Sequence, residues 1–215
     1  MENSTVKVFS FVIFVTFFLS AYGLSAPPWP NTFSVRFQTT VFPFCAGACC
    51  NKSMPTSCVV QELGNYGMDS VLYYDYTVQS ERIDFSGCSA NGTPGPCTFI
   101  FNATAGFLIQ NDQCCQAASV GTVQPTWTQV LHYINNQQAY NTPTQVFSGG
   151  VPLHSYFFNN ATNSPVQLLV HDINEHWHFT EPFSVGPLDP NLFVLPSNCA
   201  VCSSDVVLPA IHRLQ

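Results

Sequence analysis

Residues 70–85 read Ser-Val-Leu-Tyr-Tyr-Asp-Tyr-Thr-Val-Gln-Ser-Glu-Arg-Ile-Asp-Phe and form the clearest strand–turn–strand pattern in the chain. Val71 to Tyr76 is β-branched and aromatic, which suits a half-buried sheet surface. From Arg82 to Ser86 polar and apolar residues alternate, which predicts a strand with one face toward water. The polar residues 77–81 can turn between them. A lone hairpin is marginally stable in water, so we expect neighbouring segments to add strands and a core.

Further strands are predicted on both sides of this hairpin. Phe33 to Thr39 alternates, with apolar side chains at odd positions. Pro125 to Asn135 is the one predicted helix, because its apolar residues recur at helical spacing and Thr126 can cap its start. The remaining predicted strands are residues 98–102, 107–109, 145–147, 153–158, 165–170 and 176–179. About eight short strands and one short helix predict a mainly β fold.

The C-terminal part contains Pro182, Pro187, Pro190 and Pro196, which predict an extended strap with Cys199 near its end. Residues 24–215 show no internal repeat and no change of composition that would mark a linker. We therefore expect a single β domain over residues 24–215, preceded by a leader over residues 1–23.

The leader has the features of a secretory signal peptide. Lys7 precedes an apolar run from Val8 to Leu19, and small residues follow, so cleavage is expected after Gly23, with Ser25 nearly as good. A membrane anchor is the competing interpretation, but the run is shorter than the ~20 residues of a helical span. No later stretch is long and apolar enough to cross a bilayer. The sequence thus predicts an exported protein that does not span the membrane.

The ten cysteines all follow the leader, and an even number in an exported chain is typical of disulfide bonds. Zinc is the alternative for residues 45–58, but no Cys-x-x-Cys pair occurs there and adjacent cysteines are poor tetrahedral ligands. Cys114 and Cys115 are neighbours in sequence, which rarely bond each other, so we expect two bridges that leave this point in different directions for distant segments. The predicted disulfide cysteines are Cys45, Cys49, Cys50, Cys58, Cys88, Cys97, Cys114, Cys115, Cys199 and Cys202.

Four N-glycosylation sequons after the leader fit the same compartment, each an acceptor if it lies on an exposed loop. A fifth, at Asn3, would be lost with the leader. We expect some of the four to be used, and not all. They are Asn51, Asn91, Asn102 and Asn160.

Charge excludes one class of partner. Only 8% of residues are charged and the formal net charge is -7. Four strong bases remain after the leader, so the surface cannot neutralise many phosphates. Nucleic-acid binding depends mostly on such neutralisation, and we expect none.

The sharpest polar cluster is His171-Asp-Ile-Asn-Glu-His-Trp-His178. On a strand His176 and His178 share one face and Glu175 points to the other. Imidazoles and carboxylates are ligands for zinc or copper, which makes a metal-dependent hydrolase at His171, His176 and His178 one alternative. The spacing supplies no further fixed ligand, so we expect histidines bonded to their neighbours. No Gly-x-Ser-x-Gly elbow and no phosphate-binding glycine loop occur, and we predict no enzyme.

The chain is rich in aromatic residues, with 19 Phe, 8 Tyr and 3 Trp. A large Phe-rich core is one explanation and the commoner one. The other is a curved sheet whose inner face lines a cavity for a hydrophobic ligand. Which member of each alternating pair points inward stays open. The candidate lining residues are Phe99, Phe101, Phe107, Trp127, Phe157 and Trp177.

The order of several motifs resembles that of the ependymin-related family of secreted glycoproteins. They are Tyr73-Tyr-Asp75, Glu81-Arg-Ile-Asp-Phe85, a cysteine at Cys114 or Cys115, Pro125-x-Trp127 and Asp189-Pro-Asn-Leu-Phe193-Val-Leu-Pro196-Ser-Asn-Cys199. The resemblance implies a fold like that of bacterial lipoprotein carriers, with two antiparallel sheets curled into a half-open barrel around an apolar pocket. It also implies lipid and calcium binding, N-glycosylation, dimer formation, an extracellular or endolysosomal location and no catalytic residues.

The sequence and the resemblance together predict a secreted, disulfide-bonded glycoprotein that binds a hydrophobic small molecule or lipid in a β-sheet pocket. A structural or adhesive extracellular protein with calcium-dependent contacts is the second interpretation. We expect no required cofactor. Calcium is the candidate ion, although the acidic residues form no Asp-x-Asp-x-Asp-Gly loop and their spacing favours ordinary surface acidity. A second copy of the chain is the candidate protein partner.

Overall fold

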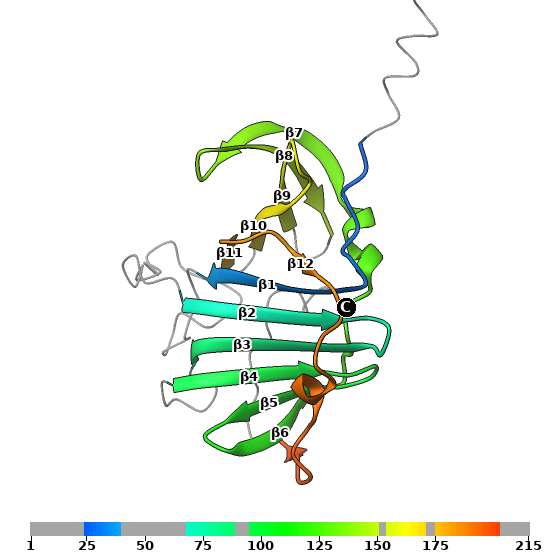
Figure 1. The fold of residues 1–215 in the computed structure, drawn as a ribbon, viewed down its shortest axis with the longest axis vertical. Helices are drawn as coiled ribbons and strands as arrows, with labels where there is room; N and C mark the ends of the chain where they lie inside the picture. The colour runs from blue at the N-terminus through cyan, green and yellow to red at the C-terminus, as the bar shows by residue number, and fades with distance from the viewer. Residues whose placement is uncertain (1–23, 40–67, 89–94, 151–153, 171–174, 203–215) are drawn as a thin grey trace, which may run out of the picture.

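The computed structural model describes residues 24–39, 68–88, 95–150, 154–170 and 175–202. Their strands all belong to one sheet, in the order β13-β6-β5-β4-β3-β2-β1-β11-β10-β9-β8-β7, with β12 also paired to β1 (Figure 1). The elements are β1 Thr32–Thr39, β2 Met68–Asp75, β3 Ser80–Cys88, β4 Gly95–Phe101, β5 Gly106–Gln110, β6 Gln113–Ala118, β7 His132–Ala139, β8 Thr142–Gly149, β9 His154–Asn159, β10 Pro165–Val170, β11 Glu175–Phe179, β12 Ser184–Val185 and β13 Ala200–Val201, with 3-10 helices η2 Pro125–Val130 and η4 Pro190–Phe193.

The mainly β class is confirmed, but the prediction of two sheets is wrong. Strand β1 joins the two halves, because it pairs with β2 along one edge and with β12 and β11 along the other. Figure 1 shows β1 between β2–β6 on one side and β7–β11 on the other. The sheet is curved but not closed into a barrel: β7 pairs with β8 and β13 with β6, and these two ends do not pair with each other.

The central hairpin is confirmed. Strands β2 and β3 pair antiparallel from Ser70↔Phe85 to Asp75↔Ser80. Asp75 Oδ1 accepts a hydrogen bond from the backbone N–H of Thr77 at 3.0 Å, and Gln79 adopts φ 50°. The polar turn residues therefore supply the local hydrogen bond and the left-handed conformation that a tight connection needs.

The predicted helix over residues 125–135 is largely wrong. Only η2 forms, and β7 begins at His132. Gln124, and not Thr126, occupies the N-cap position, with no side-chain hydrogen bond. Val130 and Ile134, expected on the buried stripe, are 58% and 56% exposed. Pairing with β8 gives this segment backbone hydrogen bonds that a short isolated helix could not match.

Four strands are not predicted from the sequence. Strands β12 and β13 have two residues each and lie in the predicted strap, and the side chains of β6 and β7 do not alternate in polarity. Strand β6 contains the paired cysteines, and β7 reads His-Tyr-Ile-Asn-Asn-Gln-Gln-Ala. Both lie toward the ends of the sheet. There most of the β7 side chains are exposed, so burial imposes no period-two pattern.

The main core covers one face of the sheet, which we call the inner face. Side chains from β1 to β5 and β8 to β11 pack there in one cluster. Trp29, from the proline-rich segment before β1, is 3% exposed and packs edge-on against Phe33 and Tyr74. Its Nε1–H donates to the Tyr156 hydroxyl at 3.0 Å, which ties this segment to β9.

A smaller cluster lies on the opposite face, which we call the outer face. It centres on Phe157 and Val146, neighbours across β8 and β9. On β9, Phe157 is flanked by Tyr156 and Phe158, which belong to the inner cluster, so alternation along the strand separates the two clusters.

The C-terminal strap crosses half of the sheet. It pairs with β1 through β12, reaches β3 at η4, and ends parallel to β6 as β13. The Arg82 guanidinium donates to the carbonyl of Leu192 at 3.1 Å, which holds η4 against β3. Asp189 accepts from the backbone N–H of Asn191 and so caps η4.

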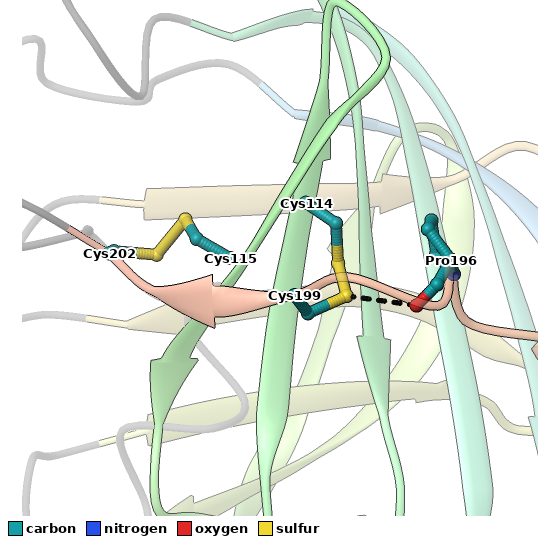
Figure 2. Close-up of a disulfide and its surroundings, with 5 residues drawn as sticks. All are labelled: Cys114, Cys115, Pro196, Cys199 and Cys202. Atoms are coloured by element: carbon teal, nitrogen blue, oxygen red, sulfur yellow. Dashed lines mark hydrogen bonds between the residues drawn. A yellow bond between two sulfur atoms is a disulfide. The ribbon is translucent and has the colours of Figure 1, made fainter.

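Two disulfide bonds fasten the end of the strap to β6 (Figure 2). They join Cys114 to Cys199 and Cys115 to Cys202, at sequence separations of 85 and 87 residues. The prediction that the adjacent cysteines bond distant segments is confirmed, but the two bridges end on the same segment. Cys97 is disulfide-bonded as well. Outside the described residues lie Cys45, Cys49, Cys50, Cys58 and the side chain of Cys88.

The predicted leader, residues 1–23, also lies outside the described residues. Within the described part of the chain, no helix has the length and apolar character needed to cross a membrane.

Candidate functional site

A continuous row of aromatic rings runs across the inner face from β11 to β4. Trp177 stacks on Phe37 with ring centroids 4.3 Å apart. Phe37 meets Phe85 edge-on at 6.2 Å, and Phe85 meets Phe99 edge-on at 6.1 Å. Phe99 stacks with Phe101 at 6.2 Å. We call these five residues the aromatic row; each is at most 2% exposed.

Four of the six candidate lining residues meet on the inner face. Phe99, Phe101 and Trp177 belong to the inner cluster, and Trp127 is half-buried against it. Phe107 is half-buried and lies between Gly106 and Leu108, which are both buried on the inner face. Because side chains alternate along a strand, Phe107 points to the outer face. Phe157 belongs to the outer cluster.

Two members of the row, Phe37 and Phe85, are not among the lining residues predicted from the sequence. Both lie on strands that the sequence predicts, and both occupy the buried phase of the alternation. In β1 the apolar side chains at odd positions, Phe37 among them, face the core. Residues paired across adjacent strands share a face, so the same face of β3 includes Phe85.

Polar groups are also buried on the inner face. Glu81 and Glu175 are both fully buried, and Glu175 Oε1 accepts a hydrogen bond from Trp177 Nε1–H at 2.7 Å. The expectation that Glu175 points away from His176 and His178 is confirmed by the burial pattern of β11. Burial raises the pKa of Tyr74, and the nearby Glu81 raises it further. Burial also raises the pKa of Tyr156. Both phenols therefore keep their protons to a higher pH than an exposed tyrosine does.

The two described histidines of the polar cluster lie on the outer face. His176 and His178 are half-buried, and His171 lies outside the described residues. The His178 ring stacks on Tyr140 with centroids 3.5 Å apart and planes 11° from parallel. Burial lowers the pKa of His178 and raises that of Tyr140. In the described part of the chain, no three His, Cys, Asp or Glu residues come close enough to hold a metal ion.

A cavity of about 440 Å³ opens beside this stacked pair. Its walls come from the β7–β8, β9–β10 and β11–β12 connections and combine hydroxyl groups, an amide and aromatic rings. The lining residues are Tyr140, Thr142, Asn159, Thr162, Ser164, Pro165, Val166, His178, Phe179, Thr180, Glu181 and Pro182.

Two of the four predicted glycosylation sites are described. Asn160 is exposed at the β9–β10 turn. Asn102 is half-buried, and its Oδ1 accepts from the backbone N–H groups of Thr104 at 3.0 Å and Ala105 at 2.9 Å. Asn51 and Asn91 lie outside the described residues.

Comparison with known proteins identifies a fold but no family. No protein-family model matches the chain, and no curated protein matches it. Among solved structures, the chain is similar to an uncharacterized conserved protein from Thermus thermophilus, with a TM-score of 0.50 and 9% sequence identity. The match covers 80% of this chain and 90% of the Thermus chain. At this identity the likeness concerns the fold alone.

Proposed function

We propose that this chain is an exported, disulfide-bonded glycoprotein that binds a hydrophobic small molecule or lipid against the inner face of its sheet. The observation that carries the proposal is the aromatic row, in which rings from β11, β1, β3 and β4 follow one another across that face. Apolar surface contributes roughly 25 cal/mol per Å² removed from water, so an acyl chain that leaves water to lie along the row gains affinity from the burial of its own surface.

The open topology supports the same proposal. The rings are buried against one another, so a guest has to enter between the two halves of the sheet. Because β7 and β13 do not pair, the halves can separate without breaking a closed ring of backbone hydrogen bonds. The guest would then replace ring–ring contacts with ring–guest contacts of similar kind.

The three tryptophans allow a direct test. Trp29 and Trp177 belong to the inner cluster and Trp127 packs against it, and the chain has no others. Bromine atoms quench indole emission on contact, so 9,10-dibromostearic acid should reduce tryptophan emission saturably, whereas stearic acid should not. Iodide in solution cannot enter an apolar interior, so it should quench only the half-buried Trp127, and the emission of Trp29 and Trp177 should be little affected before and after lipid is added. Unsaturable quenching, or none, would contradict the proposal.

A second measurement uses the native ligand. Lipid extracted from protein purified from its own source and identified by mass spectrometry should recur at a fixed ratio to protein. Repeated absence of lipid would favour a structural or adhesive extracellular protein instead.

A further inference from the structure

The cavity beside Tyr140 lies at the end of the sheet where the β7–β8, β9–β10 and β11–β12 connections meet, and no residue of the aromatic row lines it. Tyr140 and Asn141 form the β7–β8 turn with φ 49° and 60°, a left-handed pair typical of two-residue hairpin turns. The turn places the Tyr140 ring on His178 of β11, and Tyr140 remains 49% exposed. The stacked pair thus offers an aromatic surface that is both rigid and open to the cavity.

The polar walls of this cavity suit a sugar ring. Thr142, Thr162, Ser164 and Thr180 contribute hydroxyl groups. The Thr162 hydroxyl donates to Ser164 Oγ at 3.0 Å and that of Thr180 to the Arg36 carbonyl at 3.3 Å, so toward a sugar these two act as acceptors. Glu181 is the only acidic side chain among the lining residues, which include no Lys or Arg. Hydroxyl groups at the edges and an aromatic ring on one side match a saccharide, which presents hydroxyls at its rim and C–H groups on its face.

A sequon lies at the rim of the same cavity. Asn160 is exposed, its neighbours Asn159 and Thr162 line the cavity, and Asn160-Ala161-Thr162 is an acceptor sequence. The Asn160 N–H donates to the carbonyl of Pro143 at 3.1 Å, and Asn159 Oδ1 accepts from the N–H of Ala161 at 2.8 Å. These bonds hold the turn in place against the start of β8, so a sugar attached to Asn160 begins beside the cavity.

We propose that Asn160 carries an N-linked glycan and that its first N-acetylglucosamine lies in this cavity against Tyr140. The inference rests on the proposed export, because only an exported chain meets the glycosylation machinery. It assigns the sugar a structural role: the ring covers the stacked pair and ties the β7–β8 and β9–β10 turns together.

The test compares the protein with one sugar, with none, and with the aromatic ring removed. The full chain with its own leader is expressed in eukaryotic cells that make oligomannose glycans, and glycopeptide mass spectrometry should find Asn160 occupied. Endoglycosidase H then leaves a single N-acetylglucosamine, which should preserve Tm. Asn160→Gln should lower Tm by about 2–4 °C, a shift typical of removing one modest interaction from a domain of this size.

Tyr140→Ala provides the decisive comparison. It should lower Tm in the glycosylated protein. Adding Asn160→Gln to Tyr140→Ala should then lower Tm by little more, because both changes break the same contact. Thr104→Ala is the matched control: it removes the sequon at Asn102 and keeps the Asn102 side chain. Its effect on Tm should add to that of Tyr140→Ala.

Three outcomes would overturn the inference, and they separate it from the proposed function. If other sequons are occupied and Asn160 is bare, the inference fails and export stands. If Asn160 is occupied but the decreases in Tm caused by Asn160→Gln and by Tyr140→Ala simply add in the double variant, the glycan does not lie on the Tyr140 ring. If the chain with its leader is retained in the cell without any glycan, the proposed export fails and the inference fails with it.

Discussion

Phe99 and Phe157 are buried phenylalanines at the centres of strands, yet they belong to opposite faces of the sheet. The sequence predicts both strands and the alternation within them. It does not reveal which phase of the alternation faces the larger core, because that depends on which face the rest of the chain covers. Register between strands resolves the ambiguity, and register is not encoded in any one strand.

This pair gives a matched test of the lipid proposal. Phe99→Leu and Phe157→Leu make the same change at similarly buried sites, 2% and 5% exposed. Each should cost about 1–2 kcal/mol of unfolding free energy. Only Phe99→Leu should weaken binding of the brominated acid, by about 3- to 10-fold, because only it removes a ring from the inner face. Equal effects of the two variants on affinity would contradict the assignment of the site.

Buried phenols should make the fold sensitive to alkali. The pKa values of Tyr74 and Tyr156 are raised in the folded state, whereas in the unfolded chain they return to about 10. Above pH 10 the unfolded chain therefore releases protons that the folded chain keeps, and stability falls as pH rises. The slope should be up to about 1.4 kcal/mol per pH unit for each phenol. Urea unfolding at pH 8, 10 and 11 measures it.

Tyr74→Phe tests the cause of this alkaline loss. It removes one of the two phenols and should make the loss between pH 10 and 11 shallower than in the unaltered protein. It should also lower stability at pH 8, because the Tyr74 hydroxyl donates to the Val123 carbonyl at 2.7 Å. A loss just as steep in the variant would show that other groups titrate.

At the scale of elements, the chain is easiest to interpret where one face of a strand is buried. Strands β1, β2, β3 and β11 alternate in burial, and all four are predicted from the sequence: β1, β3 and β11 from alternating polarity and β2 from its β-branched and aromatic residues. Most side chains of β7 are polar and exposed, so its sequence does not alternate. Its Ile134, together with Val130 just before the strand, has the spacing of an apolar helical face and so wrongly indicates a helix. The prolines predict that the strap is extended. They do not predict that its end is bonded to β6, because the spacing of cysteines in a sequence does not determine which of them form disulfide bonds.

The doubled attachment of the strap predicts a non-additive stability. Each bridge alone closes a loop of more than 80 residues, for which chain entropy gives about 4–5 kcal/mol. Because Cys114 and Cys115 are adjacent, the second bridge closes almost no new loop. Replacing Cys114 and Cys199 with alanine, or Cys115 and Cys202, should therefore cost much less than replacing all four. Urea unfolding of the three variants without reductant measures this, and two equal losses that sum to the third would refute it.

At the scale of the whole molecule, the sheet is continuous but unevenly joined. Strand β1 pairs with β2 at eight successive positions. Its other edge is shared between β12, at Phe33 and Ser34, and β11, at Phe37 to Thr39, with residues 180–183 between them. This interrupted edge is the seam between the two halves. Trp177 and Phe37, which open the aromatic row, lie on either side of it.

Hydrogen exchange should therefore show the seam opening. In the free protein, amides of β11 and β12 should exchange faster than those of the β2–β3 hairpin, because fewer and discontinuous pairs hold them to β1. Stearic acid bound to the aromatic row spans both sides of the seam, so it should slow exchange in β11 and leave the hairpin unchanged. Phe99→Leu should reduce this protection and Phe157→Leu should not. Equal exchange at the seam and the hairpin, with no response to lipid, would mean that the halves do not separate and that no guest enters between them.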